Sequence, residues 1–82
     1  MKLPRDISGE RLAELLAAFG YRKTRQSGSH IRLTTTDFGE HHITIPSHSA
    51  VKLGTLNSII RDVAAHSKAT REEVMEKLFG KK

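Results

Sequence analysis

Two short segments near the middle of the chain alternate between apolar and polar residues, and this alternation constrains the fold more than any other feature. Within Ser29–Thr35 the regularly spaced apolar residues are Ile31 and Leu33, and His41–Ile45 continues the same alternation. A period of two residues is typical of a strand with one buried and one exposed face. We therefore expect two strands that share a hydrophobic core.

Turn signals separate these segments and precede them. Asp37–Glu40 reads Asp-Phe-Gly-Glu and is typical of a hairpin loop, while Pro46 cannot donate a ladder hydrogen bond and is expected to end the strand. A shorter basic strand is expected at Tyr21–Arg25, followed by a turn at Ser27-Gly28. Together these segments predict a three-stranded antiparallel sheet.

Helical periodicity flanks the predicted strands. The first helix is expected to begin after Ser8, a suitable N-cap, and to end at Gly20, which suits the left-handed conformation that often follows a helix. Thr70 and Glu73 have the spacing of a capping box for a last helix over about 70–79. Apolar residues at helical spacing define the first helix and a second one over 55–66: Leu12, Leu15, Leu16 and Phe19, then Leu56, Ile59, Ile60 and Val63.

These elements predict an α+β fold in which the helices cover one face of the sheet. With 82 residues, the chain is expected to form one domain over residues 1–82. The other face of the sheet is expected to be wet and to carry His30, Arg32 and His42.

Composition excludes several classes of function. The chain has no cysteine, which excludes disulfides, cysteine nucleophiles and thiolate metal sites. No apolar run approaches the ~20 residues needed to span a bilayer, and the first residues lack the apolar stretch of a signal peptide. We therefore expect a cytoplasmic protein with no membrane partner.

Positive charge is concentrated around one histidine. The formal net charge is +5, yet the first 20 residues are close to neutral. Residues 21–36 contain no acidic residue before Asp37 and hold four basic ones: Arg22, Lys23, Arg25 and Arg32. A local positive field of this kind attracts polyanions, which favours contact with nucleic acid over a charge that serves only solubility.

His30 stands at the centre of this basic region, directly after Ser27-Gly28-Ser29. An imidazole accepts and returns a proton near neutral pH, and RNA supplies its own nucleophile in the 2′-hydroxyl. Arg32 follows on the same strand face and is placed to hold a phosphate, while Gly28 permits close approach of a ligand or a positive φ. A solvated surface histidine is the alternative interpretation.

The other histidines and serines give weaker support for a metal site or a catalytic site. His41 and His42 are adjacent on a strand and point to opposite faces, so we predict no metal site and no cofactor. His42 and His48 are weaker candidates for a second proton-transfer group, and His66 is expected to be structural. No Gly-x-Ser-x-Gly motif supports a serine hydrolase.

A second phosphate site is suggested before the predicted second helix. Lys52 precedes helical N–H groups that attract phosphate. Capping of the helix by Thr55 is the alternative.

Several of these segments together resemble the HicA (YcfA-like) toxin family of bacterial type II toxin–antitoxin systems. The resemblance rests on Gly28-Ser29-His30 in a strand, on Thr-Ile-Pro-Ser-His at Thr44–His48, and on Gly54-Thr55-Leu56 followed by two isoleucines. It implies a double-stranded-RNA-binding-domain-like fold, α-β-β-β-α, to which this chain adds a C-terminal helix. It also implies a ribosome-independent mRNA endonuclease and a HicB-type antitoxin that covers the active site.

By this resemblance the family's catalytic histidine corresponds to His30 and its glycine to Gly28. RNA-binding residues are then expected among the surrounding basic and turn residues: Lys23, Arg25, Gly28, Ser29, Arg32 and Lys52. Many relatives carry a second histidine or an aromatic residue soon after the first, whereas this chain has Ile31 and Leu33, which leaves the general acid unassigned. A non-catalytic double-stranded RNA-binding module is the alternative function.

Overall fold

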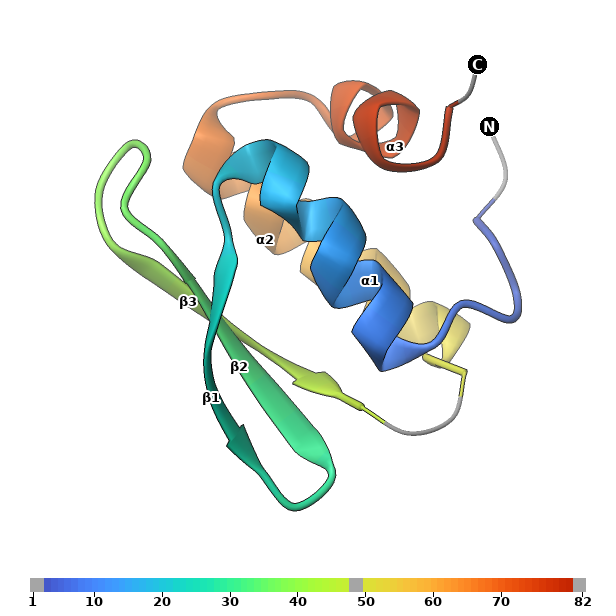
Figure 1. Cartoon of the computed structure of the whole chain (residues 1–82). Coiled ribbons are helices and arrows are strands. Elements are labelled where there is room, and N and C mark those ends of the chain that lie inside the picture. The colour runs from blue at the N-terminus through green and yellow to red at the C-terminus, as the bar shows by residue number, and fades with distance from the viewer. Residues whose placement is uncertain (1–2, 48–49, 81–82) are drawn as a thin grey trace.

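A computed structural model of the chain describes residues 3–47 and 50–80. The elements follow the predicted order, helix, three strands and two helices (Figure 1): α1 (Gly9–Leu15), a 3-10 helix η1 (Leu16–Phe19), β1 (Arg22–Ser27), β2 (His30–Thr35), β3 (His41–Pro46), α2 (Leu53–Ser67) and α3 (Arg71–Phe79). The predicted α+β fold, α-β-β-β-α with an added C-terminal helix, is confirmed and matches a double-stranded-RNA-binding-domain-like arrangement.

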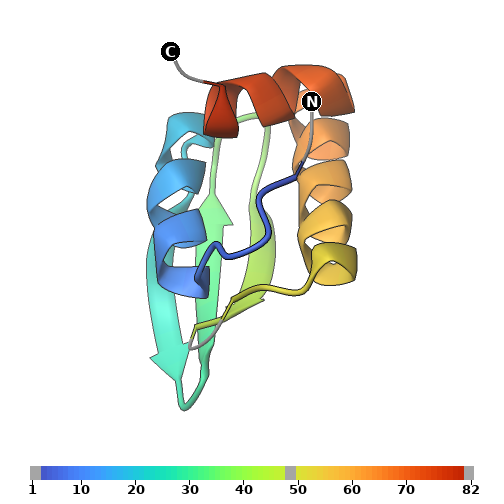
Figure 2. The same ribbon diagram turned by 90° about the vertical axis from the view of Figure 1, so that its right-hand side faces the viewer.

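The molecule has two layers. The sheet is antiparallel with β2 in the centre. Helices α1 and α2 lie side by side over one face, and α3 crosses their ends (Figure 2). We call the other, uncovered face of the sheet the open face; its residues are Arg22, Thr24, Arg25 and Ser27 of β1, His30, Arg32 and Thr34 of β2, and His42 and Thr44 of β3.

One hydrophobic core joins the layers. Ile31, Leu33 and Ile45 of the sheet are buried against Leu12 and Leu16 of the first helical segment. The apolar stripe predicted for the second helix is buried as well, and so are three apolar side chains of α3: Leu56, Ile59, Ile60 and Val63, then Val74, Met75 and Leu78. Both Met75 and Phe79 pack on this core.

Most of the predicted helix ends are confirmed. Ser8 Oγ accepts a hydrogen bond from the Arg11 N–H at 3.0 Å, and Gly20 adopts φ +83° after η1. Thr70 and Glu73 form the reciprocal capping box. Capping of α2 by Thr55 is wrong, because α2 begins at Leu53 and Thr55 is its third residue.

The first strand differs from its prediction. It runs over Arg22–Ser27 and not Tyr21–Arg25, and the turn is Gly28-Ser29. Tyr21 is buried beneath the sheet instead of belonging to it. The register also shifts between Lys23 and Arg25, which leaves Thr24 as an extra residue, a β-bulge.

The end of the sheet near this turn is fixed by close backbone contacts. A Cβ atom added to Gly9 would overlap the Pro46 carbonyl oxygen, so α1 approaches the end of β3 where only glycine fits. The next residue, Ser47, donates its N–H to the Ser29 carbonyl at 2.7 Å. The Gly28-Ser29 turn is therefore tied to the segment that leaves β3.

Candidate nucleic-acid interface

The Gly28-Ser29 turn forms one end of the open face. It is a two-residue hairpin loop, since Ser27 pairs directly with His30. Gly28 has φ +57°, and Ser29 keeps a negative φ, the pattern of a type II′ turn with glycine at its first central position. A Cβ atom on Gly28 would meet nothing within 4 Å, so the space beside the turn is free for a ligand.

His30 is the first residue of β2, and its side chain is exposed. It lies between Ser27 of β1 and Pro46 of β3 on the open face. Within residues 3–47 and 50–80 its imidazole makes no hydrogen bond or ion pair. Both ring nitrogens are thus available to an incoming molecule.

Two arginines face each other beside this histidine. Arg25 and Arg32 are direct cross-strand partners, and both are exposed. Like charges directly opposite in a sheet destabilise it, and neither guanidinium pairs with an acidic group in the described part of the chain. The sheet therefore presents an unneutralised positive site next to His30.

The structure separates two of the predicted RNA-binding residues from this site. Lys23 pairs with buried Leu33 and lines a shallow pocket with Glu10 and Glu14 of α1, so it lies on the helix side of the sheet. Lys52 is exposed at the N-cap of α2, in the helix layer. Arg25, Gly28, Ser29 and Arg32 lie around His30.

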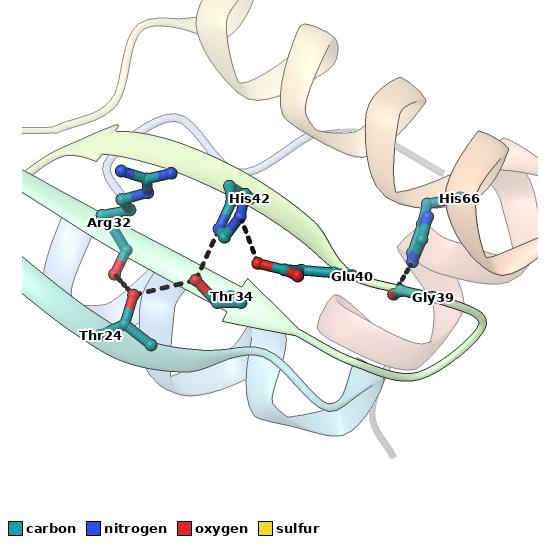
Figure 3. A network of polar contacts seen from close by, with 7 residues as sticks. All are labelled: Thr24, Arg32, Thr34, Gly39, Glu40, His42 and His66. Carbon is teal, nitrogen blue, oxygen red and sulfur yellow. Dashed lines mark hydrogen bonds and ion pairs between the residues drawn. The ribbon is translucent and has the colours of Figure 1, made fainter.

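A chain of polar contacts crosses all three strands on the open face (Figure 3). The Thr24 and Thr34 hydroxyl oxygens are 2.9 Å apart, and the Thr34 oxygen is 2.8 Å from Nδ1 of His42. Nε2 of His42 lies 3.0 Å from a carboxylate oxygen of Glu40. Sequence analysis placed His42 on this face but did not predict this chain of contacts. Its last link, from Thr34 to Thr24, depends on the bulge.

His42 lies too far along the sheet from His30 to act on the same substrate bond. His30 pairs with Pro46, whereas His42 pairs with Thr34, four residues further along β2. At ~3.4 Å per residue the two backbone positions are about 14 Å apart along the strands. The His42 ring is held at its own end of the sheet by Thr34 and Glu40, too far away to act on a phosphodiester at His30. His48, the other candidate for a second proton-transfer group, lies outside the described residues.

Two further histidines, His41 and His66, hold the hairpin between β2 and β3 against α2. Nε2 of His66 donates to the carbonyl oxygens of Asp37 and Gly39 at 2.8 and 2.9 Å, which confirms a structural role. The His66 ring stacks on His41 with ring centres 4.4 Å apart. Sequence spacing gave no sign of this contact between a loop and a helix 27 residues later.

His41 and Tyr21 form a neutral hydrogen-bonded pair. The Tyr21 hydroxyl lies 2.8 Å from Nδ1 of His41. Burial, with the charge of Asp62 adding to it, raises the pKa of Tyr21 to about 12, so the phenol remains a donor. Burial and the neighbouring His66 lower the pKa of His41, which favours the neutral ring as acceptor.

Across the described residues, no three histidine, aspartate or glutamate side chains come together in a way that could hold a metal ion. No helix in the same part of the chain is long and apolar enough to cross a bilayer.

Comparison with known proteins gives one match. Residues 9–64, from α1 to most of α2, match the family model described as HicA toxin of bacterial toxin-antitoxin. Searches of curated proteins and of solved structures give no significant match. The matched region contains the whole sheet and the open face.

Proposed function

Because the chain belongs to the HicA toxin family of bacterial toxin–antitoxin systems, we propose that it arrests translation as an mRNA endonuclease with His30 at its active site. The observation that supports this proposal is the local environment of His30. An unpaired, exposed imidazole stands beside two unneutralised arginines and an open glycine turn.

The proposed reaction uses the 2′-hydroxyl of RNA as the nucleophile. His30 removes the hydroxyl proton, the 2′ oxygen attacks phosphorus, and the bond from phosphorus to the 5′ oxygen breaks. The 5′ oxygen takes up a proton from solvent, which leaves a 2′,3′-cyclic phosphate and a 5′-hydroxyl. DNA lacks the nucleophile and is not cleaved, and the reaction needs no metal or cofactor.

The residues around His30 position the RNA phosphate and stabilise its negative charge. Arg32 lies on the same strand face two residues further on, and Arg25 faces it. Their guanidinium groups hold the phosphate and neutralise charge that develops on it. Gly28 and Ser29 let the RNA backbone approach the turn closely, since no side chain projects from Gly28.

A HicB-type antitoxin is the expected partner. An inhibitor of this site has to cover the open face, which carries Arg25, Arg32 and His30. We expect the antitoxin to present acidic groups to it, because charge complementarity directs association. The substrate, mRNA, places the action of the toxin in the cytoplasm.

The test is an RNA-cleavage assay with a chelator present, comparing wild type with His30→Ala and analysing the product ends. Wild type is expected to yield cyclic-phosphate ends, and the variant is expected to bind RNA without cleaving it. The His30 side chain is exposed and makes no hydrogen bond or ion pair within the described residues, so the fold is expected to persist. Equal cleavage by both proteins contradicts the assignment, and salt-sensitive binding without cleavage by either indicates a binding module instead.

A further inference from the structure

We infer that His42 is a second phosphate-binding residue for RNA, and that Glu40 occupies its phosphate position in the free protein. This inference rests on the proposed function, since it extends the RNA path from His30 along the open face. Figure 3 shows the residues concerned, together with Arg32 on the same side of the sheet.

The partners of His42 fix which nitrogen carries the proton. A carboxylate only accepts hydrogen bonds, so Nε2 of His42 donates to Glu40. In the neutral ring Nδ1 then accepts from the Thr34 hydroxyl, which in turn accepts from Thr24. The ring is thereby held with one N–H directed at an anionic oxygen.

The same contacts also satisfy the protonated ring. Nδ1 then donates to Thr34, the Thr34 hydroxyl donates to Thr24, and the Thr24 hydroxyl donates to the Arg32 carbonyl at 3.3 Å. The chain of hydroxyl groups reverses direction without losing a partner. Nε2 therefore presents an N–H to an anion in both protonation states.

Glu40 is a weak occupant of this position. The side chains of His42 and Glu40 are 39% and 68% exposed, and an ion pair in solvent contributes little stability. Glu40 lies in the loop before β3 and makes no other ion pair among the described residues. An RNA phosphate, which also offers anionic oxygens, can replace the carboxylate without disturbing Thr34 or Thr24.

Spacing places this phosphate on a path from His30. Arg32 lies halfway along β2 between His30 and Thr34, the partner of His42. Over the resulting ~14 Å an extended RNA strand passes from the cleaved phosphate at His30, across Arg32, to a phosphate about two nucleotides away at His42. The inferred ligand is therefore single-stranded RNA that lies along the strands.

The experiment measures affinity for RNA whose 2′-hydroxyls are methylated, which binds without being cleaved. Two lengths are compared: a short RNA with one nucleotide on each side of the mapped cleavage site, and a longer RNA with four on each side. The variants are His42→Gln, Glu40→Gln and the double variant. Glu72→Gln, an equal charge change at an exposed position of α3, is the control for Glu40→Gln.

His42→Gln is expected to weaken binding of the longer RNA by roughly fivefold, the size of one exposed charge-assisted contact, and to leave the short RNA unchanged. Glu40→Gln is expected to strengthen binding of the longer RNA about twofold, a gain that disappears in the double variant. A purely structural role for His42 does not produce this dependence on RNA length.

Three results overturn the inference: an equal effect of His42→Gln on both lengths, no effect on either, or the same gain from Glu40→Gln and Glu72→Gln. If wild type still cleaves RNA and His30→Ala does not, the proposed function stands while the second site falls. If wild type neither binds nor cleaves RNA, both fall together.

Discussion

At the scale of single residues, the proposed RNA-binding surface depends on Arg25 and Arg32. These two arginines are direct cross-strand partners on β1 and β2, and like charges at such positions oppose folding. Arg25→Gln is therefore expected to raise the free energy of unfolding by a few tenths of a kcal/mol while weakening RNA binding. The slope of log affinity against log salt is negative, and each lost phosphate contact makes it less steep by about 0.7 for single strands. Measuring affinity at several salt concentrations gives this slope.

Lys23→Gln is the matched control for this prediction. It removes the same charge from the same strand, but the bulge at Thr24 turns Lys23 toward α1, away from the open face. Its salt slope is expected to match that of wild type. Equal slopes for Arg25→Gln and Lys23→Gln contradict the division of the basic residues between the two faces.

At the scale of elements, the approach of α1 to the end of β3 depends on Gly9. A methyl group there meets the Pro46 carbonyl, so the helix or the strand end has to move. Gly9→Ala is expected to lower the free energy of unfolding by about 3 kcal/mol, measured by denaturant unfolding. The same movement displaces Ser47 from Ser29, so cleavage activity is expected to fall as well.

Gly54→Ala is the control for this effect. Gly54 lies in the first turn of α2, and an added Cβ meets nothing within 4 Å. This variant is expected to be as stable as wild type or up to about 1 kcal/mol more stable, because alanine favours helix. A comparable loss of stability in both variants rules out the contact with Pro46 as the cause.

The helices and strands were predictable from local sequence patterns, but the contacts between them were not. Apolar spacing and capping residues located the helices, and alternation located β2 and β3, since these signals act within a few residues. The bulge at Thr24 arises from pairing between two strands, and the requirement for Gly9 arises from a strand 37 residues later. Sequence analysis therefore placed His30 and Arg32 correctly on one face of the sheet but grouped Lys23 with them.

At the scale of the whole molecule, α3 belongs to the core although the family match ends at residue 64. Val74, Met75 and Leu78 are buried against α2 and η1. Met75→Ala is expected to lower the free energy of unfolding by about 3 kcal/mol, the range for a buried side chain of this size, whereas exposed Glu72→Gln changes it little. Unchanged thermal stability of Met75→Ala contradicts a core role for α3.

The stability of the whole molecule is also expected to depend on pH through His41. Its pKa is lowered in the folded state, so near pH ~6 the unfolded chain binds more protons than the folded one. The stabilisation is complete above the unfolded pKa of ~6.5 and is lost as pH falls from there through the lower folded value. Denaturant unfolding at a series of pH values, from about 7.5 down to 5, measures this loss.

His41→Gln isolates the contribution of His41 to this pH dependence. Glutamine does not titrate, and its amide oxygen can still accept a hydrogen bond from Tyr21. The other four histidines remain, so the expected result is a smaller loss of stability between pH ~7 and ~5 than in wild type. If both proteins lose the same stability, the titration of His41 does not control the response.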